Sequence, residues 1–286
     1  MGDHGPLYLP TFAAVTALAL LVVFRAGQRV LAPEHTLRAD VEGGNVARSL
    51  LQVGHVLGVV LIAGSVVAGV VKGERVRDDA LWAAAFGLSG VGLLALTGRV
   101  GVRLLLRSRL PAEIERGNAA AGVAAGGHYV ATAIVIARSF SGDGLGELGL
   151  SFFFFAAAQV TLHLFVALFR ALTTYDDGEE VLQENLAAAL SYAGATVSIA
   201  LLVGRAAEGD FVGWGPSLRS YALTLASCLV LYPVRQLVVQ GLLLGARPTL
   251  RGGRLDAGIA AERSVGMGAL EGVSYLATAL LLNRLQ

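Results

Sequence analysis

Two stretches with the same pattern decide the fold of this chain: Asp40-Val-Glu-Gly-Gly-Asn45-Val-Ala47 and Glu113-Ile-Glu-Arg-Gly-Asn118-Ala-Ala120. A third copy, Glu180-Val-Leu-Gln-Glu-Asn185-Leu-Ala187, keeps the first acid, the Asn and the Ala. After each Asn the chain runs apolar for several helical turns. A fourth segment has Arg263 where the Asn is expected. The repetition predicts one helical hairpin that is used four times.

The composition is that of a membrane protein. Of the 286 residues 55% are hydrophobic and 15% charged, and the mean hydropathy is +0.66, whereas a soluble domain is about a quarter charged. Runs of about 20 apolar residues can cross a bilayer. We expect eight spans: Leu7–Leu31, Val46–Val71, Leu81–Leu106, Ala119–Ala137, Leu148–Leu172, Leu186–Val203, Tyr221–Leu244 and Val265–Leu282. The predicted fold is an all-α polytopic membrane bundle, with halves 1–141 and 142–286 of two hairpins each.

Other features of the sequence exclude classes of function. A net charge of +1 does not resemble the basic footprint of a nucleic-acid-binding protein. The single cysteine, Cys228, permits no disulfide within the chain. The N-terminus has no positively charged region before its apolar run, so we expect a retained helix rather than a signal peptide. No metal-ligand, phosphate-binding or hydrolase motif is present, and we expect no metal, no cofactor and no enzymatic activity.

The positive charges predict an orientation. Loops that follow odd-numbered spans hold about twice as many cations as the loops on the opposite side. Because Lys and Arg stay on the cytoplasmic side of a membrane, the loops with the repeated motif should be cytoplasmic and both termini periplasmic.

Each odd-numbered span carries an arginine near its cytoplasmic end: Arg25, Arg99, Arg170 and Arg235. One interpretation is that these side chains extend to the lipid headgroups and fix the topology. The alternative is that they pair with the loop carboxylates Glu42, Glu115 and Glu180, or bind an anionic headgroup or solute.

The motif loops also have two interpretations. Their acidic and amide residues are Asp40, Glu42, Asn45, Glu113, Glu115, Asn118, Glu180 and Asn185. Asn is among the best N-cap residues, and acids favour the positive end of a helix, so capping alone explains the motif. However, Ser, Thr and Asp cap as well, and here an Asn recurs with an acid five residues earlier. The second interpretation is therefore that these loops form the functional cytoplasmic entrance of a polar path.

Several polar residues lie at mid-membrane depth. Glycines nine residues after each Asn position, where small residues let helices approach, predict helix crossings at Gly54, Gly127, Gly194 and Gly272. Ionisable groups at this depth usually face a bundle interior or a wet cavity, and the candidates for a polar path are His55, His128, Gln159, His163 and Glu271. If the halves pack with pseudo-twofold symmetry, the second and eighth spans should approach a common axis at equal depth, and His55 or His128 could share a proton with Glu271. The alternative is a structural role, in which the histidines only form hydrogen bonds within the bundle.

The seventh span contains Pro233 in Leu231-Tyr-Pro-Val-Arg235. A proline within a transmembrane helix frees backbone groups and bends the helix. We expect a kink beside Arg235, which serves either as a gate or as a packing bend.

The motif of Asp40–Ala47 and Glu113–Ala120, followed by a long apolar helix with a central glycine, resembles that of the domain of unknown function 350 family, the YjfL-like inner-membrane proteins. The resemblance implies a bundle of about four helices, here duplicated in tandem, in a bacterial inner membrane. It implies no established activity, and an association with envelope-stress and polyamine-related genes. The fourth repeat departs from the pattern at Arg263, which argues against a role that needs four equivalent loops.

Two functions therefore remain as hypotheses. The first is a channel or transporter for an ion or small polar solute, linked to envelope stress, with the polar path through the bundle. The second is a membrane scaffold whose cytoplasmic loops recruit a peripheral stress-response or lipid-remodelling protein. In both cases the partners are the lipid bilayer and, we expect, further copies of the chain in a homo-oligomer.

Overall fold

A computed structural model describes residues 7–31, 37–105, 110–209 and 211–285, and all regular structure in them is helical. Most elements are α-helices, while η1 is a 3₁₀-helix and η2 and η3 are π-helices. In chain order they are α1 Tyr8–Leu31, α2 Leu37–Glu42, α3 Val46–Val70, α4 Val76–Leu105, α5 Leu110–Glu115, α6 Ala119–Ser139, α7 Leu145–Ala171, α8 Asp177–Leu182, α9 Leu186–Ala207, α10 Trp214–Leu225, η1 Ala226–Val230, α11 Leu231–Pro233, η2 Val234–Leu243, α12 Arg254–Asp256, η3 Ala257–Ala261 and α13 Val265–Leu285.

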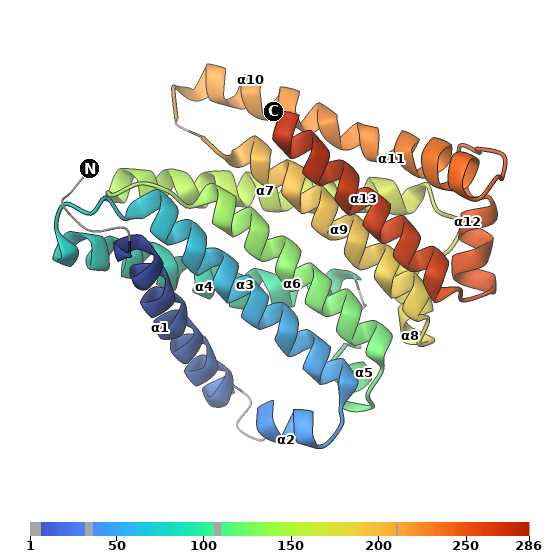
Figure 1. Ribbon diagram of the computed structural model, residues 1–286, viewed down its shortest axis with the longest axis horizontal. Helices are drawn as coiled ribbons and strands as arrows, with labels where there is room; N and C mark the ends of the chain where they lie inside the picture. The colour runs from blue at the N-terminus through green and yellow to red at the C-terminus, as the bar shows by residue number, and fades with distance from the viewer. Residues whose placement is uncertain (1–6, 32–36, 106–109, 210, 286) are drawn as a thin grey trace.

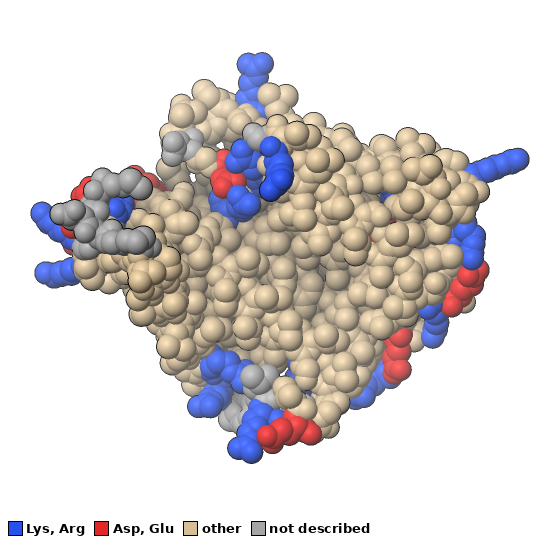
Figure 2. All heavy atoms as spheres, in the orientation of Figure 1, with Lys and Arg blue, Asp and Glu red and all other residues tan. Residues whose placement is uncertain are grey.

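Eight helical segments in the described chain are long and apolar enough to cross a membrane. They are α1, α3, α4, α6, α7, α9, the continuous segment from α10 to η2, and α13. Figure 2 shows charged side chains near the ends of the helices, whereas the surface over the middle of α6 and α9 is free of them. The expected all-α polytopic bundle with eight spans is confirmed.

The even-numbered spans form a row. Helix α6 packs between α3 and α9, and α9 packs between α6 and α13, so the four helices lie side by side across the molecule (Figure 1). Helices α4 and α7 lie behind this row and contact α6 and α9. The short helices α2, α5, α8 and α12 follow one edge of the molecule, next to the N-terminal ends of the row helices. We call this edge the motif end.

Glycines allow the row helices to touch backbone to backbone. A Cβ atom added at Gly54 would lie 2.6 Å from Gly126 Cα, and one added at Gly194 would overlap the backbone of Gly272. Gly127 faces Ala193 in the same way, with 2.6 Å to its Cβ. Small residues at such crossings let helices approach in a membrane, where packing rather than burial from water drives association. The four glycines predicted from the repeat therefore lie at the helix crossings.

The first and last helices of the row are separated by the other two. Helix α3 stands at one end and α13 at the other, with α6 and α9 between them. The expectation that the second and eighth spans meet on a common axis is wrong. The reason is that each row helix packs against the next repeat, which produces a linear array instead of a closed ring.

The seventh span changes its helical form at the proline. It runs as α-helix in α10, as 3₁₀-helix in η1, and as π-helix after Pro233. Proline has no N–H to donate to the preceding turn, and the wider π turn places Arg235, Gln236, Val239 and Gln240 on the buried side. π-Helical segments are rare and often mark functional sites. The irregularity expected at Pro233 is a change of helix type that carries polar side chains into the bundle.

Candidate functional site

The motif asparagines join each repeat to the next one. In each case Asn Oδ1 accepts from the first turn of its own helix, for example from the backbone N–H of Arg48 at 2.9 Å for Asn45. The Nδ2 group donates to a backbone carbonyl of the following repeat at 2.8 Å: Asn45 to Ile114, Asn118 to Val181, and Asn185 to Ile259. An ionised Asp can only accept, whereas the Asn amide accepts through Oδ1 and donates through Nδ2 in these two directions at once.

In the second and third repeats the acid five residues before the Asn orients this amide. Glu113 accepts from Asn118 Nδ2 at 2.7 Å, and Glu180 accepts from Asn185 Nδ2 at 2.8 Å. In the fourth repeat Arg263 stands in place of the Asn and donates backward to the carbonyl of Gln183 at 3.1 Å. The junction between repeats thus explains the motif spacing.

The other residues of the motif loops lie at the surface. Glu42 pairs with Arg38 at 2.9 Å on the exposed side of α2, and the carbonyl of Glu115 lies 3.4 Å from Asn45 Nδ2. The side chain of Asp40 falls outside the described residues. The described contacts of Glu42 and Glu180 are with Arg38 and Asn185 and not with the repeated arginines of the spans.

A buried charge centre surrounds Arg235 in the second half. Its Nε donates to Glu271 Oε1 at 2.5 Å, and its Nη2 donates to Asp256. All three side chains are 1 to 2% exposed. Glu271 also accepts from Ser191 at 2.8 Å and from Tyr275 at 3.3 Å. Glu271 therefore finds its partner across the bundle, but this partner is an arginine and not a histidine.

A second arginine extends the centre toward the motif end. Arg170 Nη1 lies 2.8 Å from Asp177 Oδ1, with the two side chains 16% and 10% exposed, and its guanidinium lies over the ring of Tyr192. Burial raises the pKa of Asp177 to about 7; Arg170 opposes this rise, and the negative charges of Glu271 and Asp176 add to it. Asp177 is thus the carboxyl of the centre whose proton exchanges near neutral pH.

The centre holds one negative charge in excess. Two guanidinium groups, of Arg170 and Arg235, face three carboxylates, of Asp177, Asp256 and Glu271. Among the described residues, four buried atoms of the centre have no hydrogen-bond partner: the carboxylate oxygen Asp177 Oδ1 and the guanidinium nitrogens Arg170 Nε, Arg170 Nη2 and Arg235 Nη1. A net charge buried in a membrane protein costs several kcal/mol. The excess carboxylate therefore favours uptake of a proton.

A line of polar rings leads away from this centre. The ring of His128 stacks on that of His163 with centroids 5.4 Å apart, and His128 Nδ1 lies 3.4 Å from the Tyr192 hydroxyl. His163 Nε2 in turn lies 3.3 Å from Gln159 Nε2. Because Tyr192 also touches Arg170, the polar groups form a contiguous series from mid-membrane to Asp177.

His55 belongs to a separate cluster in the first half. Its Nδ1 lies 3.2 Å from Gln28 Nε2, its ring meets Tyr129 edge-on at 4.1 Å, and Arg25 Nη1 donates to Gln28 at 2.7 Å. This cluster opens on a cavity of about 240 Å³ that Arg99 also lines. Of the five residues of the expected polar path, His128, His163 and Gln159 form one connected series, Glu271 belongs to the charge centre, and His55 lies apart.

Asp177 and Asp256 complete the charge centre, and sequence reasoning missed both. Each lies in a short helix outside the long apolar spans, and at such a position the sequence predicts an ordinary surface carboxylate. One signal could have indicated Asp256: it follows the Gly252-Gly253 pair directly upstream of a degenerate motif. No group of three or more His, Cys, Asp or Glu in the described chain could hold a metal ion.

The fold and these sites define a multi-pass membrane protein made of two similar halves. Residues 7–140 and again residues 143–285 match the family described as Domain of Unknown Function (DUF350). The chain belongs to this family, as a tandem duplication of its domain. No curated protein and no solved structure matches the chain.

Proposed function

We propose that the protein transports cations across the membrane, with the proton as the ion bound at the charge centre of Arg170, Asp177, Arg235, Asp256 and Glu271. The observation that carries this proposal is the single excess carboxylate in that centre. An exchangeable cation held within the membrane is the minimal requirement of a cation carrier. A purely structural ion cluster needs no such excess, because equal numbers of charges satisfy it.

The surroundings of the centre supply a route for a proton. Asp177 lies at the motif end and reaches the surface with a tenth of its side chain. From there Arg170, Tyr192, His128, His163 and Gln159 follow one another. Chains of ionisable and hydroxyl groups within membrane spans are typical of proton relays. The π-helical η2 carries Arg235 into this site and is the element we expect to move during transport.

The cellular setting follows from sequence and family. We place the protein in the bacterial inner membrane with the motif end in the cytoplasm and both termini in the periplasm, because cations favour the motif side. Asp177 then samples cytoplasmic pH. An assembly of several copies and a link to envelope stress belong to the same proposal, and no enzymatic step is part of it.

Proton flux into proteoliposomes tests this function. Full-length protein is reconstituted with a pH-sensitive dye inside, and a potassium diffusion potential drives protons inward. Wild type should show flux above empty vesicles, and Glu271→Gln and Asp177→Asn should each lower the rate about tenfold or more. Each substitution removes the excess charge, so both variants should fold. The matched control is Glu208→Gln, which alters a carboxylate paired with Arg138 and Arg205 outside the centre.

The absence of wild-type flux of protons or monovalent cations would overturn transport. If Glu271→Gln is also silent in cells, the scaffold hypothesis takes its place. Equal flux in wild type and in both centre variants would show that protons cross by another route.

A further inference from the structure

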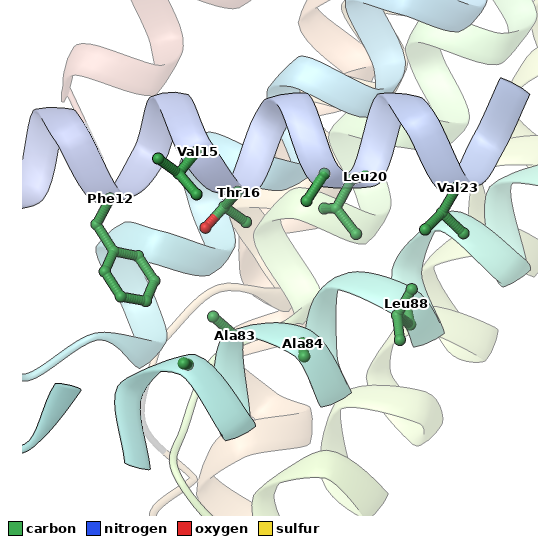
Figure 3. Close-up of a pocket in the computed structure, with 10 residues that line it drawn as sticks. Phe12, Val15, Thr16, Leu20, Val23, Ala83, Ala84 and Leu88 are labelled. Atoms are coloured by element: carbon green, nitrogen blue, oxygen red, sulfur yellow. The ribbon is translucent and has the colours of Figure 1, made fainter. Parts of the chain in front are cut away.

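A groove between α1 and α4 in the first half is separate from the charge centre. It consists of two adjoining cavities of about 380 and 240 Å³, which share Val23 and Leu88 in their walls. Figure 3 shows the larger cavity, with Phe12, Thr16 and Leu20 of α1 projecting toward α4. Its volume falls in the range of about 300–1,000 Å³ that is typical of ligand pockets.

The groove changes from apolar to polar along its length. Phe12, Val15 and Leu20 of α1 and Ala83 of α4 line the larger cavity, and Thr16 supplies its one polar side chain. The smaller cavity lies nearer the motif end and is lined by Gln28, His55, Arg99 and Tyr129. From Leu20 to Gln28 the helix rises about 12 Å, which fits within the roughly 15 Å of one leaflet of the hydrocarbon core.

The polar end of the groove is positively charged. Arg99 is exposed there, and Arg25 Nη1 reaches Gln28 Oε1 in its wall at 2.7 Å. Among the residues that the structure describes, no carboxylate lines either cavity. Arginine binds phosphate through paired N–H donors, and basic pockets between transmembrane helices bind anionic headgroups.

We propose that this groove binds one anionic phospholipid, with an acyl chain along Leu20, Val23 and Leu88 and its phosphate at Arg25 and Arg99. A transmembrane helix of another copy, about 10–12 Å wide, does not fit, because α1 and α4 already contact each other along the groove. A small soluble anion would leave the apolar length empty. The lipid satisfies both ends of the groove at once.

Two glycines allow the groove to be closed without a clash. A Cβ atom added at Gly27 or at Gly92, both in the wall of the smaller cavity, meets no other atom within 4 Å. A phenylalanine at Gly92 therefore enters empty space instead of displacing the helices. Gly149 on α7 has the same open surroundings at a distance from the groove and provides the matched control.

Photolabelling of the full-length protein in nanodiscs tests the site. The probe is a phosphatidylglycerol with a diazirine on one acyl chain, and mass spectrometry locates the adducts. We expect adducts concentrated on α1 and α4, about tenfold fewer in Gly92→Phe, and no change in Gly149→Phe. The double variant Arg25→Gln with Arg99→Gln should lose the preference for phosphatidylglycerol over a phosphatidylcholine probe, while thermal unfolding confirms that it is folded.

Two results would overturn the proposal. Labelling that is spread over all spans and unchanged in Gly92→Phe would identify ordinary boundary lipid. Crosslinks between two copies through a cysteine at Val15 would instead assign the groove to a second chain. Neither result depends on proton flux, so the lipid site and the transport function fail separately.

Discussion

The two halves of the molecule place an arginine at corresponding points of their hairpins and surround it with different groups. In the first half Arg25 contacts the amides of Gln28 and Gln52, and Arg99 is exposed beside a cavity. In the second half Arg170 and Arg235 are largely buried and meet carboxylates. The same helical frame therefore supports an open amphipathic groove in one half and a closed charge centre in the other.

A few positions produce this difference. The residue eight positions after the motif Asn is Glu271 in the fourth repeat, counted from Arg263, and Val53, Gly126 and Ala193 in the others. The residue eight positions before the motif Asn is Asp177 in the third repeat, whereas the other three repeats have a leucine there. The two halves thus share a scaffold of glycine crossings and Asn junctions, and isolated acidic residues in the second half supply the charges.

The comparison predicts a large difference between equivalent arginines. Arg235→Leu leaves Glu271 and Asp256 buried without a counter-charge, and breaking such a buried network costs about 3–5 kcal/mol. Arg99→Leu removes an exposed charge and should cost less than about 1 kcal/mol. Thermal unfolding of both variants in detergent measures the difference.

A matched control for this pair is Arg235→Leu combined with Glu271→Leu. The double variant removes one carboxylate together with the arginine and should recover part of the lost stability. If Arg235→Leu and Arg99→Leu unfold at the same temperature, the two halves do not differ in the way that their contacts indicate.

The second prediction concerns pH, and its source is Asp177. Its pKa is about 7 in the folded protein, where burial raises it from 3.8. The folded state therefore keeps a proton that the unfolded chain releases, and stability falls as pH rises from about 4 toward 7, by at most about 1.4 kcal/mol per pH unit. Above pH 7 both states have lost the proton, and this contribution stays constant.

Melting temperatures between pH 5 and 8 measure this slope. Asp177→Asn should flatten it, and Glu271→Gln should shift its upper limit to lower pH, because Glu271 contributes to the raised pKa. Glu208→Gln, outside the centre, should retain the wild-type slope. A wild-type slope that survives in Asp177→Asn would assign the proton to another group. The equivalent position of the first half holds Leu37, which has no proton to exchange.

Sequence reasoning predicted the frame of the molecule and much less of the site. The eight spans, the four repeats and the crossings at Gly54 and Gly194 follow from local patterns, because apolar length and glycine spacing act within each hairpin. The order of the helices in the row does not follow from such local patterns. The expected meeting of α3 and α13 failed because helix order depends on contacts between repeats, here the bonds from each Asn to the next carbonyl.

The partners within the site show the same limit. Glu271 was identifiable from its depth in an apolar span, since an isolated ionisable group in a membrane indicates function. Its partner Arg235 was identifiable as part of the repeated arginine pattern, but nothing local to either residue pairs them across 36 positions. Asp177 escaped notice because its burial depends on the packing of α8 against α6 and α9 and not on its own segment.

The smallest predicted effect concerns Asn118, which lies at the border between the halves. Its Nδ2 donates to Val181 of the second half and to Glu113 of its own loop, and its Oδ1 caps α6 through the N–H of Ala121. Asn118→Asp keeps the cap, since Asp caps as well as Asn, but it removes the donor and sets a carboxylate against a carbonyl oxygen. We expect a loss of about 1–3 kcal/mol, measured by thermal unfolding.

The size of this loss separates the two interpretations of the motif. If capping were its whole role, Asn118→Asp would match wild type and only Asn118→Leu would lose stability. If the bond between the repeats matters, Asn118→Asp loses stability, and Asn45→Asp loses less because Asn45 is less buried. Such a graded result would mean that the halves depend on the junction for their alignment, and that the charge centre rests on a frame held by three amide groups.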